Sequence, residues 1–336
     1  VDIVDALEEV MAGGTPKYFG SIDAPVDEGD RILATPEYSA YLRIAEGCDN
    51  HCSYCVIPSL RGKYRSRPME NIVAEAEELA RSGVKELIVI AQDITRYGLD
   101  CYGAHKLPEL LRKLCGISGI HWIRLHYLYP DEITAELIDV VAAEKKILPY
   151  LDIPIQHCSD AVLKAMNRRG DKAYLAELFA RLRARIPGLV LRTSIIAGLP
   201  YEDEAAFEEL CDFLREQKFE RAGVFPYSPE EGTPAAAMEN RVDEEEANRR
   251  VELLVDLQSR VMDEFNESWL GDTVEILCEG FDGQAQMYVG RSYADSPDVD
   301  GHVYFTAEED LVPGAFVPVR ITGSMDGDMT GEAVQI

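Results

Sequence analysis

From residue 40 onward, the apolar and polar positions of the chain follow two alternating patterns. Short apolar runs typical of buried strands occur at 40–47, 84–93, 121–130, 149–157, 188–198 and 221–229. Segments whose apolar residues recur at helical spacing lie at 67–83, 131–146, 159–166, 171–186, 203–218 and 243–269. The pattern predicts six strands that alternate with helices, although none of these segments follows the strand at 84–93.

This alternation predicts the fold class. Strands that alternate with helices run parallel, because each helix carries the chain back across the sheet, and the crossovers are right-handed. Six such units are fewer than the eight of a closed (βα)8 barrel. We therefore predict an α/β fold, a partial open (βα)6 barrel whose strand carboxyl ends and following loops face one cleft.

The two ends of the chain have a different pattern of apolar and polar residues. Short β-rich runs broken by Gly, Asp and Pro occur at 272–280, 285–292, 301–309, 315–324 and 330–336. They predict a small antiparallel, OB-like barrel. Residues 1–11 form one helical stretch and loop-forming residues follow it. We expect three parts: 1–36, a linker or remnant of a preceding domain; 37–270, the open barrel; and 271–336, the small β-barrel.

Composition narrows the class of protein. With 336 residues and 46% hydrophobic content, the chain can bury a large core. It has no run of 18 apolar residues and no secretory signal pattern, so we expect a soluble, cytoplasmic protein. A net charge of −28 repels phosphate backbones and membranes unless cations gather locally, and it favours basic partners.

Three cysteines, Cys48, Cys52 and Cys55, lie within eight residues directly after the first predicted strand, on the rim of the expected cleft. A four-iron cluster normally takes four thiolates, so three would leave one iron open. An open iron at such a mouth can chelate a small molecule, and a low-potential cluster can pass it one electron. This arrangement suits the reductive cleavage of S-adenosylmethionine.

Two other interpretations of this loop stay open. Zinc could take the three thiolates together with His51, although structural zinc usually draws its ligands from two separated pairs. The thiols could also be buried and free, although the polar neighbours Asp49 and Asn50 favour a loop. The other cysteines are too scattered for a disulfide scaffold and are typical of small buried residues: Cys101, Cys115, Cys158, Cys211 and Cys278.

The spacing C-x3-C-x2-C, together with the (βα)6 pattern, resembles the radical S-adenosylmethionine superfamily. The runs AYLRIAEGCDNHCSYC, LDIPIQHCSDAVLKAMNRRGD and LRTSIIAGLP resemble its methylthiotransferase branch, and the carboxyl-terminal part resembles the TRAM domain of that branch. The runs YLYPDEI and GRSYADSPDVDG resemble the RimO type, which methylthiolates the β-carbon of one aspartate in small-subunit ribosomal protein S-twelve. The close relative that methylthiolates isopentenylated adenosine in tRNA is the alternative.

The resemblance implies a 4Fe-4S cluster on the three cysteines and S-adenosylmethionine as the second cofactor. It also implies an electron donor such as flavodoxin or ferredoxin. Methylthiotransferases of this branch carry a further amino-terminal domain, whose three cysteines bind a second 4Fe-4S cluster that takes part in sulfur delivery. No such domain precedes Val1 in this sequence, so we expect the chain to cleave S-adenosylmethionine without completing the transfer.

Five further residues are expected to bind S-adenosylmethionine. The resemblance places Tyr54 near the adenine, Gln92 and Asp93 at the methionine amino group, and Gln156 in the ribose-binding region. Arg192 lies on an otherwise apolar strand, where a buried Arg needs an anion such as the methionine carboxylate or a protein carboxylate. Loop packing of Tyr54 and a turn or helix cap at 92–93 are the structural alternatives.

Three further features of the sequence bear on these expectations. His157 is more often a structural histidine in such a position. Tyr201 stands where the family generally has Gly, which puts the local turn geometry in question. The cations after the cluster loop either balance a reduced cluster, hold an acidic partner or form a solvated loop: Arg61, Lys63, Arg65 and Arg67.

Charge gives an independent indication of the partner. Residues 271–336 carry thirteen Asp and Glu against two Arg, a net charge of −11. A TRAM domain that grips tRNA should present cations, because phosphate neutralisation supplies most nonspecific affinity. An acidic barrel favours a basic ribosomal protein instead, unless the charge only serves solubility or salt adaptation. A non-catalytic module that docks on the ribosome is the remaining alternative.

Overall fold

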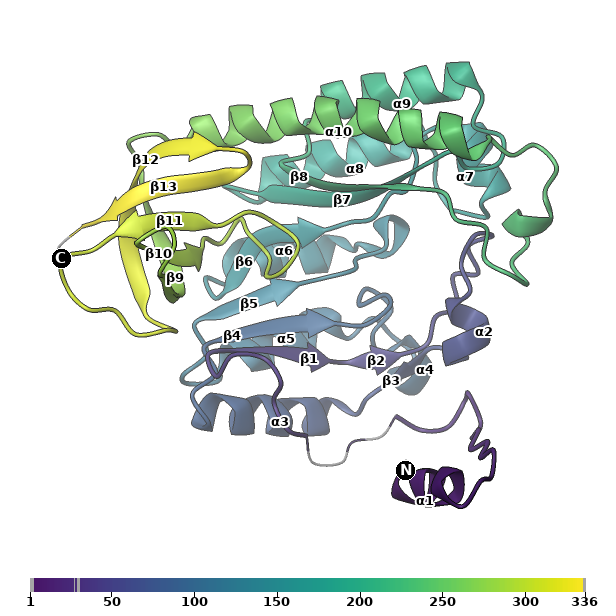
Figure 1. Cartoon of the computed structure of the whole chain (residues 1–336), viewed down its shortest axis with the longest axis horizontal. Coiled ribbons are helices and arrows are strands. Elements are labelled where there is room, and N and C mark those ends of the chain that lie inside the picture. Colours follow the sequence, from purple (N-terminus) through teal and green to yellow (C-terminus); the bar gives the residue numbers. More distant parts are fainter. Residues whose placement is uncertain (1–2, 27, 29–30, 335–336) are drawn as a thin grey trace.

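The computed structural model describes residues 3–26, 28 and 31–334. In this part of the chain, six strands form one sheet in the order β1-β4-β5-β6-β7-β8, and every neighbouring pair is parallel. The sheet curves but does not close, so the predicted partial open (βα)6 barrel is confirmed (Figure 1). Its strands are β1 (Ser39–Arg43), β4 (Glu86–Ile90), β5 (Trp122–Leu125), β6 (Ile147–Asp152), β7 (Val190–Ala197) and β8 (Arg221–Pro226).

Helices cover the outer face of this sheet: α3 (Met69–Arg81), α5 (Leu107–Cys115), α6 (Ala135–Ala143), α8 (Lys172–Arg185) and α9 (Glu204–Gln217). Their apolar stripes pack on the outward residues of the strands in one continuous core. Thr134, Asp171 and Asp203 begin three of these helices as N-caps, since each side chain accepts a backbone N–H bond. Helix α5 was not among the predicted segments.

The long helix α10 (Glu244–Glu267) follows β8, as predicted, and packs against β8 and α9. Shorter elements surround the sheet: α1 (Ile3–Met11), α2 (Ile57–Arg61), α4 (Leu99–Tyr102), α7 (Asp160–Ala165), and the paired strands β2 (Ala45–Glu46) and β3 (Arg65–Ser66). The helix expected over 1–11 corresponds to α1, although its first two residues lie outside the described ones. None of the helices in the described ranges is long and apolar enough to cross a lipid bilayer.

The carboxyl-terminal strands close into a second, small barrel in the order β10-β11-β13-β12-β9. One pair, β11 and β13, is parallel, so the expectation of a purely antiparallel barrel is wrong at this pair. The chain reaches β13 from β12 through a tight hairpin, which turns β13 into the direction of β11. The strands are β9 (Thr273–Asp282), β10 (Met287–Arg291), β11 (Val303–Thr306), β12 (Phe316–Met325) and β13 (Asp328–Ala333).

The small barrel sits at the amino ends of the β1–β8 strands, opposite the edge from which α2 and the cysteine loop extend (Figure 1). An apolar cluster that includes Trp122, Leu148, Val190 and Leu277 joins the two barrels. The α/β barrel therefore has a floor covered by the small barrel and a mouth at the strand carboxyl ends, where α/β folds place their ligands.

Candidate functional site

The cysteine loop leaves β2 at Gly47 and is held in place by backbone geometry. Gly47 has φ +81°, and a Cβ there would lie 2.1 Å from the carbonyl oxygen of Lys63, so only glycine fits. The amide of Cys48 donates to the carbonyl of Gly62 at 3.2 Å. This closure brings the chain after α2 back against the start of the loop and fixes Cys48 at the barrel mouth.

The middle of the loop is bonded to the segment that follows α7. The amide of Ser53 donates to the carbonyl of Met166 at 2.9 Å, and its hydroxyl donates to the carbonyl of Ala165 at 3.0 Å. The side chain of Asn167 donates to the carbonyl of His51 at 2.9 Å. Two separate parts of the barrel rim thus position Cys52 and its neighbours.

All three cysteines of the loop are free thiols. Cys48 and Cys55 line a cavity of about 470 Å³ together with Arg61, Gln92 and Tyr127. Burial raises the pKa of Cys48 to about 11, so its thiol stays protonated at neutral pH unless a cation binds it.

Cys52 is buried and does not line this cavity. The guanidinium of Arg168 lies 3.6 Å from its sulfur and donates to the hydroxyl of Tyr54 at 3.1 Å. The same guanidinium stacks on the ring of Tyr129, with its carbon 4.6 Å from the ring centroid. Arg168 thus places a positive charge beside the sulfur of Cys52.

The donor set is compatible with a four-iron cluster. In the described residues, no three His, Cys, Asp or Glu side chains are placed to share one metal ion, which is what the zinc alternative requires. A cubane cluster offers each thiolate its own iron, so the sulfurs need not converge on one point.

Gln92 lines the cavity of Cys48 and Cys55. Its Nε2 donates to Glu46 at 3.3 Å, whereas its buried Oε1 has no hydrogen-bond partner among the described residues. An unpaired buried acceptor costs about 1–3 kcal/mol, so it indicates a ligand donor at this place. The methionine amino group would supply such a donor.

Asp93 already has protein partners on both oxygens. It accepts from Asn50 Nδ2 at 2.8 Å and from the amide and hydroxyl of Thr95. Burial raises the pKa of this carboxyl despite those bonds. Asp93 therefore ties the end of β4 to the cysteine loop through Asn50, which sequence reasoning did not assign a role, and its direct contact with S-adenosylmethionine stays a prediction.

Arg192 lies on β7, and Gln156 follows β6 and forms an isolated parallel bridge with Ile195 of β7. Gln156 has φ +68°, its amide donates to the carbonyl of Ser194 at 2.8 Å, and its side chain is half-buried. Arg192 donates to Asp152 at 3.0 Å and its Nε lies 3.5 Å from Asp300. Arg192 thus satisfies its charge with protein carboxylates, the alternative that the sequence left open, and its role toward the cofactor stays a prediction.

The remaining predicted positions have structural roles. His157 is buried, accepts from the amide of Ser159 at 2.9 Å, and has its pKa lowered to about 3 by burial. Tyr201 adopts φ +69°, the left-handed conformation for which glycine is the ordinary choice. In the basic stretch, Arg67 is buried and pairs with Glu75 at 2.7 Å, whereas Arg61 faces the thiol cavity.

Sequence reasoning missed Asn50, Arg168 and Tyr129 as functional candidates. Only Arg168 had a signal, because it follows α7 in a run of two arginines that ends at Gly170. Its pairing with Tyr54 and Cys52 spans more than a hundred residues and needs the folded barrel.

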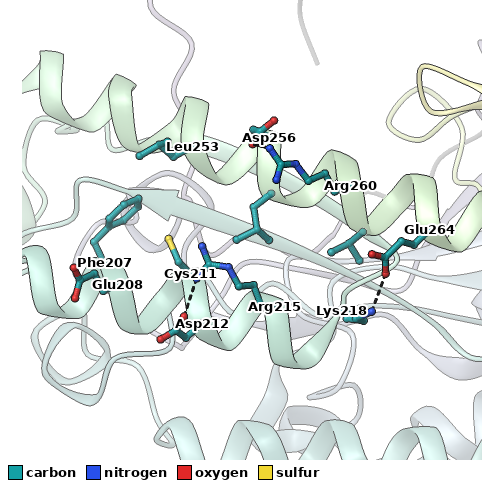
Figure 2. A pocket seen from close by; sticks show the side chains of 12 residues that line it. Phe207, Glu208, Cys211, Asp212, Arg215, Lys218, Leu253, Asp256, Arg260 and Glu264 are labelled. Carbon is teal, nitrogen blue, oxygen red and sulfur yellow. Dashed lines mark hydrogen bonds and ion pairs between the residues drawn. The ribbon is translucent and has the colours of Figure 1, made fainter.

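A larger groove of about 660 Å³ lies on the outer face, between α9 and α10 (Figure 2). Its rim carries ion pairs such as Arg215–Asp212 and Lys218–Glu264, both at 2.7 Å. Cys211 lines it, but none of the loop cysteines does. The cavity at the barrel mouth is therefore the better candidate site, although it is the smaller one.

Comparisons with known proteins identify families and relatives that are similar to this chain. The family model of the Radical SAM superfamily matches residues 42–214, and that of the TRAM domain matches 270–334. A protein of Pelotomaculum thermopropionicum named ribosomal protein uS12 methylthiotransferase RimO is 52% identical over 340 residues, or 99% of this chain and 76% of that protein. Its namesake in Caldanaerobacter subterraneus subsp. tengcongensis is 49% identical over 331 residues, or 98% and 75% of the two chains.

Solved structures are more distant. The radical SAM enzyme coproporphyrinogen III oxidase (HemN) of Escherichia coli is 18% identical with a TM-score of 0.49, covering 67% of this chain and 52% of that one. The chain spans about three quarters of the length of the two relatives named above.

Proposed function

Because this chain belongs to the RimO family of radical S-adenosylmethionine methylthiotransferases, we propose that it acts on ribosomal protein uS12 and methylthiolates the β-carbon of an aspartate. The observation that carries the proposal is the loop with three free thiols at the barrel mouth, next to a cavity with an unpaired buried acceptor on Gln92. Three thiolates leave one iron of a four-iron cluster without a protein ligand, and the cavity gives a small molecule access to it.

Cys48, Cys52 and Cys55 would hold the cluster, and Gln92 would accept a hydrogen bond from S-adenosylmethionine. When bound, the reduced cluster and S-adenosylmethionine supply radical chemistry that removes a hydrogen from an unactivated carbon. Arg168 keeps Tyr54 and Tyr129 packed over Cys52, which shields this side of the site from water.

We infer two finer features from the family. The cluster needs a one-electron donor of low potential, such as a flavodoxin or ferredoxin. The family's second cluster has no ligand set among the other cysteines of this sequence, which lie singly along the chain. The chain itself should therefore hold one cluster.

Anaerobic reconstitution followed by iron analysis tests the single cluster. We expect about four irons per chain, as one 4Fe-4S cluster requires. About eight irons, or one tightly bound zinc, would contradict the assignment.

The substrate is tested by supplying the reconstituted, reduced full-length protein and S-adenosylmethionine with either uS12 or tRNA. We expect the mass of a methylthio group on one aspartate of uS12 and none on tRNA. A mass gain on tRNA alone would overturn the substrate assignment. Failure to form deoxyadenosine after full cluster loading would favour the non-catalytic docking module instead.

A further inference from the structure

One segment of the small barrel lies inside the larger one. The loop Ser292–Asp300 between β10 and β11 projects from the small barrel toward β6 and β7 (Figure 1). Its residues bond to inward-facing side chains on four successive strands or strand ends. The pairs are Arg124–Tyr293 (carbonyl) at 2.9 Å, His126–Ser296 at 2.8 Å, Tyr150–Asp300 at 2.6 Å, Arg192–Asp300 at 3.5 Å and Arg221–Asp295 at 2.7 Å.

The tip of this loop is a closed turn. The amide of Ser296 donates to Asp300 Oδ2 at 2.8 Å, and the amide of Asp300 donates to the carbonyl of Ser296 at 3.3 Å. Between these anchors, Asp298 has φ +66° and an exposed side chain, and Val299 is 53% exposed. The turn therefore presents both side chains outward from a fixed base.

The tip lies near the thiol cavity. Ser296 bonds to His126, and the next residue, Tyr127, lines the cavity beside Cys48 and Cys55. Burial raises the pKa of Tyr41, an inward residue of β1, and the nearby carboxylate of Asp298 raises it further, with a smaller contribution from Tyr127. Asp298 at the loop tip thus lies near Tyr41 and near Tyr127, which lines the cavity.

The charge of Asp298 is not balanced. The arginines beneath it, Arg124, Arg192 and Arg221, already pair with carboxylates of the protein. Among the described residues, Asp298 has neither an ion pair nor a side-chain hydrogen bond, in contrast to its neighbours Asp295 and Asp300. A rigidly presented, unpaired carboxylate near the thiol cavity suits a cationic group of a ligand.

We propose that the loop tip of Asp298 and Val299 forms part of the substrate-binding surface of the cleft, where Asp298 pairs with a Lys or Arg side chain flanking the modified aspartate. This inference rests on the proposed function. Ribosomal proteins carry positive charge because they bind RNA phosphates, so a cation near the modified residue matches the acidic tip. The small barrel thereby takes part in substrate recognition at the catalytic cleft itself.

The test compares Asp298→Asn with Asp310→Asn in the same reconstituted protein, by calorimetric titration with uS12. Asn tolerates the left-handed conformation, so Asp298→Asn removes the charge and keeps the turn. Asp310 is an exposed acid elsewhere on the small barrel, and its substitution changes the net charge equally. We expect the Kd for uS12 to rise about tenfold for Asp298→Asn and less than about twofold for Asp310→Asn.

A charge exchange locates the partner. Asp298→Arg should weaken binding further, and a uS12 variant with Glu in place of the contacting Lys or Arg should restore it. Equal Kd values for Asp298→Asn and Asp310→Asn, with wild-type protein that binds and modifies uS12, would overturn this inference alone. Wild-type protein that neither binds nor modifies uS12 would overturn the proposed function and this inference together.

Discussion

The floor and the mouth of the open barrel use polar residues in opposite ways. At the floor, buried charges are matched: Glu86 bonds to Arg291 at 2.7 Å and to Arg124 at 3.0 Å, and Asp295 bonds to Arg221 at 2.7 Å. At the mouth, Gln92 Oε1 and His157 Nε2 are buried without hydrogen-bond partners among the described residues. Backbone strain gathers there too, in residues with positive φ: His51, Tyr127, Gln156, Asn167 and Tyr201.

This difference assigns stability to the floor and ligand binding to the mouth. Paired buried charges hold the two barrels in one relative position. Removing one partner lowers the free energy of unfolding, because the other stays buried and unpaired. Unpaired polar atoms and strained residues cost stability and persist where the surroundings fix them for another purpose, often ligand binding. Substitutions at the floor should therefore change folding, and substitutions at the mouth should change cofactor binding.

The largest effect is expected from the thiols. Cys48→Ala or Cys55→Ala should abolish cluster binding and lower deoxyadenosine formation by more than about a hundredfold. This loss is larger than the one typical of substituting a residue that only hydrogen-bonds to a metal ligand. Iron content and deoxyadenosine are measured after anaerobic reconstitution. The matched control is Cys101→Ser, an exposed thiol in α4, which should retain both. A Cys48→Ala protein with full iron content would refute the ligand assignment.

At the floor, Glu86→Gln should lower the free energy of unfolding by about 3–5 kcal/mol, because it removes the carboxylate that pairs with the buried Arg124 and one of the two carboxylates that pair with Arg291. Urea denaturation measures the loss. Glu332→Gln breaks the exposed pair with Arg320 and should cost less than about 1 kcal/mol. Similar losses for both variants would show that the buried cluster is not what holds the floor.

The same carboxylate predicts a pH dependence. Burial alone would raise the pKa of Glu86, but Arg291 and Arg124 lower it from 4.5 to about 2. A depressed carboxyl pKa stabilises the fold fully above pH 4.5, by about 3 kcal/mol, and this contribution is lost as the pH falls through about 2. The difference in unfolding free energy between wild type and Glu86→Gln should therefore shrink below pH 4.5; a constant difference down to pH 2 would contradict it.

At the mouth, Gln92→Met should weaken S-adenosylmethionine binding about tenfold, since it removes the acceptor that we assign to the ligand. The melting temperature should not fall, because an unsatisfied buried acceptor is removed as well. Equilibrium binding to the reconstituted protein measures the affinity, with the exposed Gln284→Met as the control. A lower melting temperature with unchanged affinity would make Gln92 a structural residue.

The sequence predicted the parts of the molecule that depend on local periodicity. The six strands and the position of the cysteine loop follow from apolar patterns that each element carries in its own residues. Helix α5 escaped because it follows a loop that contains the short helix α4, and no helical segment was assigned between this loop and the next strand. The direction of β13 escaped because parallel pairing depends on which strand lies beside it, and periodicity does not encode that choice.

The candidate site was predictable only where chemistry is local. The spacing of Cys48, Cys52 and Cys55 predicts a cluster. For Arg192 the sequence allows a cofactor or a protein carboxylate as the partner, and only the fold shows that Asp152 and Asp300 lie beside it. The sequence of the loop Ser292–Asp300 indicates the family but does not predict where the loop lies. Its entry into the larger barrel depends on contacts between residues up to 170 positions apart, such as His126 and Ser296.

The smallest effect is expected from the strained turn at Tyr201. This residue has φ +69° and a side chain that is 48% exposed, so its conformation costs about 1 kcal/mol with little packing in return. Tyr201→Gly should raise the free energy of unfolding by about 0.5–1 kcal/mol, measured by urea denaturation. Tyr201→Ala is the control, because it removes the ring but keeps the Cβ that makes the conformation costly. If both variants were equally stable, the strain at the mouth would not reside in the backbone of this turn, and the contrast with the paired floor would lose one of its supports.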